Sequence, residues 1–129
     1  DCKRALAREG VLVTQASSPL HAPKAFQCIL KTVASAGLSA VPYHTTIPTM
    51  GTWGWVIAQK ADLVGSTELK GRLSRLQFEI VETDFINNEA IVGMLQFWKG
   101  AFDGMGTLAI NTMMDPVVDK YYRESEWGF

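Results

Sequence analysis

The residue types that could bind a ligand gather in two short stretches of the chain. Residues 42–55 read Pro-Tyr-His-Thr-Thr-Ile-Pro-Thr-Met-Gly-Thr-Trp-Gly-Trp, which is denser in aromatic, hydroxyl and glycine residues than a plain hairpin requires. Residues 15–18, Gln-Ala-Ser-Ser, place an amide and two hydroxyls directly after a short apolar run. In α/β proteins, ligand groups sit on the loop that leaves the carboxyl end of a strand. Both stretches are therefore candidates for binding a small molecule.

The usual catalytic signatures are absent from the sequence. His21 and His44 have no Cys or paired carboxylate at metal-ligand spacing, and there is no GxSxG elbow, P-loop or glycine-rich phosphate loop before a helix. The acidic residues are scattered and more typical of a solvated surface, as at Asp62, Glu68, Glu79, Glu82 and Asp84. We expect no catalytic residue and no metal ligand within these 129 residues.

Composition indicates one soluble globular domain. The 129 residues are 47% hydrophobic and 19% charged, with a formal charge of −1, so a core can form without disulfides or a structural metal. Cys2 and Cys28 are too far apart in the sequence for a CxxC pair, and we expect both to be reduced. No stretch is long and apolar enough to cross a membrane. The near-neutral net charge does not indicate a basic surface that would bind nucleic acid.

The elements that must position the two stretches follow from periodicity and turn residues. Residues 1–10 look like the end of a helix stopped by Gly10, and 11–15 form an apolar run typical of a strand buried on both faces. Pro23 opens a helix that Gly37 ends, and residues 38–49 and 53–58 form a hairpin in which Pro48 lies at an edge or at the start of the connection. We predict further helices over 69–76 and 88–99, and a last helix with Asp115 as N-cap and Pro116 at N1.

The two stretches resemble the polyamine aminopropyltransferases, the spermidine and spermine synthases. In that family a strand ending in Gln, as in residues 10–19 (Gly-Val-Leu-Val-Thr-Gln-Ala-Ser-Ser-Pro), precedes a helix and a Tyr-x-x-x-Ile-Pro-Thr stretch, which residues 43–49 match. The Gly-x-Trp-Gly-Trp at 51–55 and residues 110–118 look like a bacterial branch that often carries an N-terminal membrane region. Residues 10–58 carry the specific part of the resemblance, and 61–109 match only loosely.

The resemblance implies an α/β fold that is part of a methyltransferase-like (Rossmann-like) domain. We expect a mixed sheet of about three strands with flanking helices, followed by a helical tail. Residues 1–60 are then the carboxyl-terminal half of the catalytic domain, and 61–129 are a mainly helical tail of the same domain. The chain also begins inside an element on this interpretation, because its first residues look like the last turns of a helix.

The implied activity is transfer of an aminopropyl group from decarboxylated S-adenosylmethionine to a diamine such as putrescine. In the family, the donor-binding loop and the catalytic Asp precede the point at which this chain starts. We therefore expect a fragment that is inactive alone, with no residue that binds the donor. A non-catalytic interaction or dimerisation domain derived from the same fold is the alternative. A fragment of a small-molecule methyltransferase is a weaker alternative, because residues 43–49 do not belong to the sequence pattern of those enzymes.

Two positions take substrate-binding roles from the resemblance. Gln15 matches the Gln whose amide faces the amine, and Tyr43 matches the Tyr that lines the diamine pocket. His44 takes the place of this Tyr in members whose Tyr stands one residue closer to Ile-Pro-Thr, so both registers stay open. Residues 16–18 replace the family's acids and leave the amine's identity open. We expect the other aromatic residues to fill the core, namely Trp53, Trp55, Phe97, Trp98, Tyr121, Tyr122 and Trp127.

The strand at 11–15 also makes self-association an expectation. It carries no charge or Pro to block pairing, and its neighbour on one side comes from the missing half of the implied fold. We expect a homodimer through this edge, unless residues 61–129 fold back over it. The parent protein is then cytoplasmic, or anchored in a bacterial inner membrane with this domain in the cytoplasm.

Overall fold

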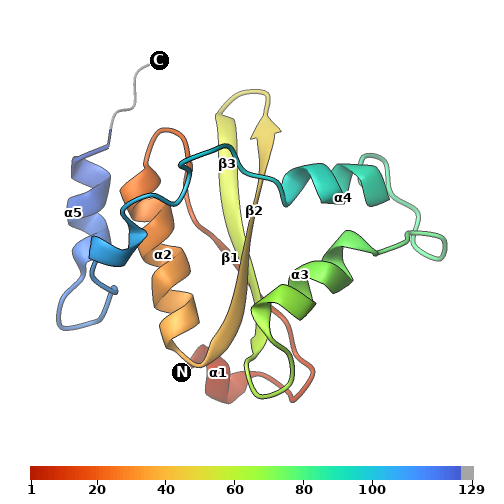
Figure 1. Cartoon of the computed structure of the whole chain (residues 1–129), viewed down its shortest axis with the longest axis horizontal. Coiled ribbons are helices and arrows are strands. Elements are labelled where there is room, and N and C mark those ends of the chain that lie inside the picture. Colours follow the sequence, from red (N-terminus) through yellow and green to blue (C-terminus); the bar gives the residue numbers. More distant parts are fainter. Residues whose placement is uncertain (126–129) are drawn as a thin grey trace.

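A computed structural model describes residues 1–125 and places a three-stranded sheet between two groups of helices (Figure 1). Helices α2 (Pro23–Ser35) and α5 (Val117–Arg123) lie on one side of the sheet, and α3 (Ser66–Ser74) and α4 (Asn88–Met94) lie on the other. A short α1 (Cys2–Ala5) precedes the sheet, and a 3₁₀ turn, η1 (Met105–Thr107), precedes α5. Within the described residues, no helix is long and apolar enough to cross a membrane.

The sheet consists of β1 (Leu12–Gln15), β3 (Gly51–Lys60) and β2 (Leu38–Ile47), in that spatial order. Both neighbouring pairs are antiparallel, so β1 and β2 run in the same direction on either side of β3. Helix α2 connects these two outer strands, and β3 returns through the hairpin to fill the space between them. The expected α/β class, with three strands, flanking helices and a helical tail, is confirmed. The sheet is antiparallel rather than mixed, because β3 runs opposite to both of its neighbours.

Helix α2 covers one face of the sheet. Pro23 stands in its first turn, where the missing N–H costs nothing, and Gly37 follows its end with a φ of 77°. Its apolar stripe buries Phe26 and Leu30 against Val56 of β3. Removing such side chains from water stabilises the fold by about 1.5–3 kcal/mol each.

Helices α3 and α4 cover the other face on the side of β2. Val41 of β2 is buried there with Val64, Leu69 of α3 and Leu95. Tyr43 and Ile57 pack against this cluster. Pro42 fits inside β2 because β2 is an edge strand, where a missing N–H on the outer side breaks no ladder bond.

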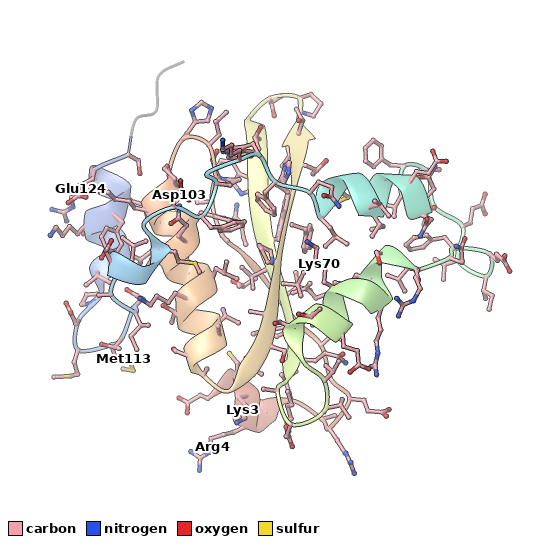
Figure 2. All side chains as sticks on the ribbon, in the orientation of Figure 1. Lys3, Arg4, Lys70, Asp103, Met113 and Glu124 are labelled. Atoms are coloured by element: carbon pink, nitrogen blue, oxygen red, sulfur yellow. The ribbon has the colours of Figure 1, made fainter. Side chains whose placement is uncertain are left out.

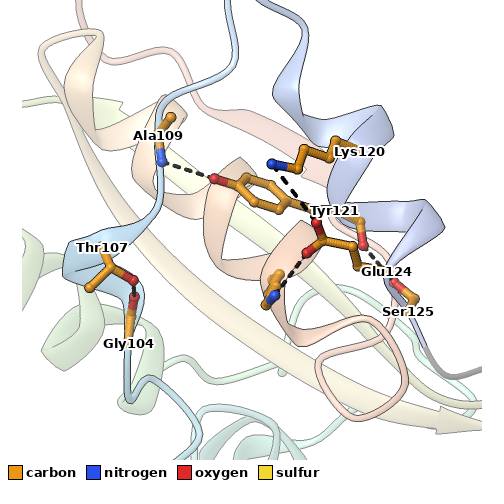
Figure 3. Close-up of polar contacts among 8 residues, drawn as sticks. Gly104, Thr107, Ala109, Lys120, Tyr121, Glu124 and Ser125 are labelled. Atoms are coloured by element: carbon orange, nitrogen blue, oxygen red, sulfur yellow. Dashed lines mark hydrogen bonds and ion pairs between the residues drawn. The ribbon is translucent and has the colours of Figure 1, made fainter.

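Polar contacts join helix α5 to α2 and to the segment between η1 and α5 (Figure 3). The Lys24 ammonium of α2 lies 2.8 Å from the Glu124 carboxylate, and the Ala109 amide donates to the Tyr121 hydroxyl at 3.1 Å. The hydrogen-bonded ion pair raises the pKa of Lys24 and lowers the pKa of Glu124. Met113, in the loop before α5, points away from the fold and is 99% exposed (Figure 2).

Several predicted helix boundaries are wrong. Helix α1 ends at Ala5, because Leu6 is already extended and Gly10 lies beyond it. Helix α3 begins earlier than residue 69, and α4 stops at Met94 rather than 99, which frees Phe97 to pack against Phe26. Pro116 is the N-cap of α5 rather than its first helical residue. The side chain that accepts from the first turn belongs to Asn111, which bonds the Val118 amide at 3.1 Å, and not to Asp115.

Burial also differs from expectation at the edges of the sheet. Strand β1 is not buried on both faces, because Val11 and Val13 are 52% and 51% exposed. The expected core residues Trp53 and Trp55 are half-buried, and Trp98 is 41% exposed. Phe97, Tyr121 and Tyr122 are partly buried. Trp127, which was also expected in the core, lies outside the described residues.

Candidate functional site

Gln15 and Tyr43 lie in one row across the sheet. Gln15 of β1 pairs with Trp55 of β3, and Trp55 pairs with Tyr43 of β2. Directly opposite residues on neighbouring strands point to the same face, so all three side chains share the face that α3 and α4 cover in part. Neighbouring strands lie roughly 4.8 Å apart, which puts the backbones of Gln15 and Tyr43 about 10 Å apart. We call Gln15, Trp55 and Tyr43 the cross-strand row.

Side-chain exposure decreases along the cross-strand row, from β1 to the other two strands. The Gln15 side chain is exposed, whereas Trp55 and Tyr43 are half-buried. The Tyr43 and Trp55 rings stack with centroids 5.7 Å apart and planes 14° apart. Burial raises the pKa of the Tyr43 hydroxyl above its ordinary value, so this group stays protonated at neutral pH and can donate a hydrogen bond.

An apolar pocket of about 250 Å³ opens beside Tyr43. Its walls come from β2, β3, α3, α4 and the segment between the two helices. We call it the Tyr43 pocket, and it is lined by Tyr43, Ile57, Leu73, Leu76, Phe78, Ile86, Ile91, Met94 and Leu95. Among these lining side chains, Tyr43 carries the one polar group, its hydroxyl. The row therefore leads from solvent at Gln15 to a hydrocarbon environment behind Tyr43.

The loop after β1 fixes the position of Gln15. The Ala16 amide donates to the Gly54 carbonyl at 2.9 Å, and the Gly54 amide donates to the Ser17 carbonyl at 2.7 Å. Ser17 has a φ of 69°, an uncommon value for a residue with a side chain, and its buried hydroxyl has no hydrogen-bond partner among the described residues. The Ser18 hydroxyl accepts from the Leu20 and His21 amides. The loop is thus tied to β3 beside Trp55.

His44 lies on the opposite face of β2 from Tyr43. Its ring packs against Phe97, with centroids 4.6 Å apart, and its Nε2 is hydrogen-bonded to the Gln96 carbonyl. Trp98 approaches the same ring edge-on at 5.7 Å. The structure therefore places Gln15 and Tyr43 on one face of the sheet, on either side of Trp55, and His44 on the other face.

The cross-strand row is suited to binding a cation that carries an aliphatic chain. The side-chain amide oxygen of Gln15 can accept hydrogen bonds from an ammonium, and the Trp55 and Tyr43 rings offer aromatic faces to the cation. The row contains no carboxylate or imidazole to accept a proton. Among the described residues, no group of three or more His, Cys, Asp or Glu side chains could hold a metal ion.

Trp55 is the member of the row that sequence reasoning missed. Its alternation with Gly54 predicts a core residue, and that alternation does place it opposite the α2 face. The available signal was the hairpin register. Once Ile47 pairs with Gly51 across the turn, counting back along both strands pairs Tyr43 with Trp55.

Comparisons with known proteins connect this site to one family. The sequence model for the spermine/spermidine synthase domain matches residues 1–69, which include the whole cross-strand row. A polyamine aminopropyltransferase of Mycobacterium tuberculosis is 40% identical over 75 residues, covering 58% of this chain and 14% of that protein. The corresponding protein of Shewanella oneidensis is 33% identical over 95 residues, or 74% of this chain and 16% of the relative.

A third relative matches nearly the whole chain. Polyamine aminopropyltransferase 2 of Aquifex aeolicus is 32% identical over 121 residues, which cover 93% of this chain and 22% of that protein. The similarity therefore extends well past residue 69 into the helical part. Across these three relatives, the matched region spans only 14% to 22% of each full-length protein.

Proposed function

Because the chain belongs to the spermine/spermidine synthase domain family, we propose that it forms part of the amine-binding wall of an aminopropyltransferase. The family's reaction moves an aminopropyl group from decarboxylated S-adenosylmethionine to an amine. The observation that carries the proposal is the register that sets Gln15 and Tyr43 on either side of Trp55. The family resemblance assigns these same two positions to the amine.

The row supplies binding and orientation in this proposal. One ammonium of the diamine donates to the side-chain amide oxygen of Gln15, and the methylenes lie along the Trp55 and Tyr43 rings. The Tyr43 hydroxyl oxygen accepts a hydrogen bond from an N–H of the free amine, which leaves the nitrogen lone pair available for attack. Holding a nucleophile in place in this way lowers the entropic part of the barrier.

The bond changes require groups beyond this row. The free amine attacks the methylene carbon beside the sulfonium sulfur, the carbon–sulfur bond breaks, and methylthioadenosine leaves with the bonding electrons. The released proton goes to a carboxylate that, in our proposal, lies outside these 129 residues together with the donor site. The relatives support this division, because each is several times longer than the matched region.

Binding of 1,4-diaminobutane to this chain tests the proposal. Titration monitored by the Trp55 indole and Gln15 amide resonances should show both shifting with one dissociation constant. Gln15→Ala and Tyr43→Phe should each weaken binding about two- to tenfold, the loss expected for one hydrogen bond. His44→Asn is the matched control, because His44 neighbours Tyr43 but faces the other way.

Two results would contradict the amine-binding role. One is unchanged affinity in both row variants, and the other is a loss confined to His44→Asn. We also expect no turnover of 1,4-diaminobutane with the decarboxylated donor by this chain alone. In a longer protein that contains it, the same row variants should lower kcat/KM.

A second candidate, a self-associating interaction domain, is favoured by the open edge of β1. Among the described residues, β1 pairs with β3 on one side, and its other edge has no strand partner. Val11 and Val13 leave apolar surface beside that edge, while α3 and α4 pack against β2 instead of folding back over β1. We propose that a second copy pairs along this edge.

Light scattering at several concentrations tests the pairing. The average mass should rise toward that of a dimer, and Val13→Lys should return it to that of a monomer. A monomer at every concentration excludes the homodimer and leaves the amine-binding proposal untouched.

A further inference from the structure

Another cavity, of about 420 Å³, lies on the α2 side of the sheet. Its walls come from the loop after β1, the first turns of α2 and residues 98–108, and no member of the cross-strand row lines it. We call it the Trp98 pocket. Its volume corresponds to roughly 14 water-sized groups at about 30 Å³ each, which is enough for a small organic molecule.

Gln27 of α2 brings a buried hydrogen-bond acceptor to this pocket. Its side chain lines the pocket and is 5% exposed, and its Nε2 donates to the Ala101 carbonyl at 3.0 Å. Its Oε1 has no hydrogen-bond partner among the described residues. Unlike the Ser17 hydroxyl, this oxygen is not fully enclosed, so it remains accessible from the pocket. A buried amide oxygen without a partner is unfavourable, and an N–H of a bound ligand supplies the missing donor.

The turn that Gln27 holds also presents an aromatic ring and a carboxylate to the pocket. The Ala101 amide donates to the Trp98 carbonyl at 3.2 Å, and the Asp103 amide donates to the Gly100 carbonyl at 3.1 Å. Trp98 and Asp103 both line the pocket, and Figure 2 shows Asp103 beside α2. Trp98 is 41% exposed, so part of its indole surface is free to contact a ligand.

The Asp103 carboxylate gives the pocket a negative charge that is not offset by an ion pair within the described residues. Lys24 lines the pocket, but its ammonium lies 2.8 Å from the Glu124 carboxylate, which compensates its charge. Lys31 and Lys99 do not line the pocket, and the Lys31 ammonium is bonded to backbone carbonyls of the segment that includes η1. The pocket therefore favours a cation over a neutral or anionic ligand.

The Thr107 hydroxyl at the rim adds a further acceptor. It donates its hydrogen to the Gly104 carbonyl at 2.7 Å (Figure 3), so its lone pairs are what it offers to the pocket that it lines. A ligand that satisfies these oxygens needs several N–H donors on one positive centre.

We propose that the Trp98 pocket is a cation site for a primary alkylammonium ion, separate from the cross-strand row. The three N–H donors of the ammonium match Gln27 Oε1 and the Asp103 carboxylate, and the alkyl chain lies against the Trp98 indole. The site lies on the opposite face of the sheet from the row and does not depend on the proposed function. Its failure leaves amine binding at Gln15 and Tyr43 untouched.

Titration of this chain with n-butylammonium chloride tests the site, because an alkylamine is fully protonated at neutral pH. The Trp98 indole and Gln27 side-chain amide resonances should shift with one dissociation constant, relative to sodium chloride at the same ionic strength. n-Butanol lacks the charge and butyltrimethylammonium lacks N–H donors, so each should bind about tenfold more weakly or less tightly still.

Two aspartates provide a matched pair of variants. Asp103 lines the pocket, whereas Asp62 is exposed, does not line it and is in no ion pair within the described residues. Asp103→Asn should weaken butylammonium binding about tenfold, the loss expected for one charge-assisted hydrogen bond, and Asp62→Asn should leave it unchanged. Trp98→Leu should weaken binding about two- to fivefold. The probe series on the unsubstituted chain keeps the test valid even where Trp98→Leu does not fold.

Each contrary result overturns a defined part of the proposal. Equal affinity for butylammonium and n-butanol, or equal effects of Asp103→Asn and Asp62→Asn, excludes an ammonium site at Asp103. Shifts confined to Gln15 and Trp55 place the ammonium at the row alone, which overturns this site and supports the proposed function. Tighter binding of Nα-acetyl-lysine methylamide than of butylammonium overturns the assignment to a free amine and assigns the pocket to a lysine side chain.

Discussion

Gly54 is the position where the core and the candidate site depend most directly on each other. Its amide and carbonyl bind the loop after β1, and its neighbour Trp55 lies in the cross-strand row. A Cβ at residue 54 would lie 2.5 Å from Cε2 of the Phe26 ring and 3.1 Å from Cδ of Pro19. Real Cβ atoms do not approach other atoms at 2.5 Å, so Gly54→Ala forces the buried Phe26 or the strand to move.

The cost can be estimated from the packing around Phe26. This ring is completely buried and contacts Phe97 and Phe102 at centroid distances of 5.9 and 6.3 Å, so it has no free direction in which to rotate. Overpacking of this kind costs about 1–3 kcal/mol, and we take about 2 kcal/mol. The unfolding entropy of a 129-residue chain is about 0.27 kcal/mol/K, so Tm should fall by about 7 °C.

Thermal and urea unfolding provide the assay. Gly93→Ala is the control, because Gly93 lies in α4 and nothing stands within 4 Å of a Cβ there. It should raise stability by about 0.5–1 kcal/mol, the opposite sign to Gly54→Ala. Adding Phe26→Leu to Gly54→Ala should recover about 1 kcal/mol relative to the sum of the single changes. A Gly54→Ala protein that unfolds within about 0.5 kcal/mol of the unsubstituted chain would refute the steric argument.

Three further predictions follow from single features of the structure. Cys2 should react rapidly with a thiol reagent and Cys28 only at the rate of unfolding, because Cys28 is buried and burial raises its pKa. Ser17→Gly should raise the free energy of unfolding by about 1 kcal/mol in urea titrations, since it removes a positive φ and an unpartnered buried hydroxyl. The stabilisation that Glu124 gains from Lys24 is present above the ordinary carboxyl pKa and lost as pH falls through its lowered pKa. The protection factors of the α5 amides, which correct for the intrinsic pH dependence of exchange, should therefore fall in acid, and Lys24→Met should remove that fall.

The order and type of the elements between residues 12 and 60 could be predicted because local signals and tertiary contacts agree there. Pro23 and Gly37 delimit α2, and the apolar residues between them face the sheet. The turn at Pro48 falls between two runs of residues with strand propensity, and β2 and β3 pair on either side of it. The same agreement fixed Gln15 at the end of β1.

Beyond residue 60, long-range packing overrides the local pattern. The spacing of Ile91, Leu95 and Trp98 predicts a helix through 99, yet the chain leaves the helix at Met94. Phe97 gains contacts with Phe102 and the α2 face in this way, while Trp98 stays 41% exposed. Nothing in the local spacing shows which of the two adjacent aromatic residues would be buried.

The geometry of the hairpin determines which face of the sheet carries Tyr43 and which carries His44. Alternation along β2 places Val41 and Tyr43 on one face and His44 on the other, and a one-residue slip would exchange the two sets. Such a slip would move Val41, which is 2% exposed, out of the cluster that it forms with Leu69 and Leu95. Burying a side chain of that size is worth about 1.5–3 kcal/mol, and the loss would recur at other positions along the strand. The register that keeps this core intact is therefore the one that places Tyr43, and not His44, on the same face of the sheet as Gln15 and Trp55.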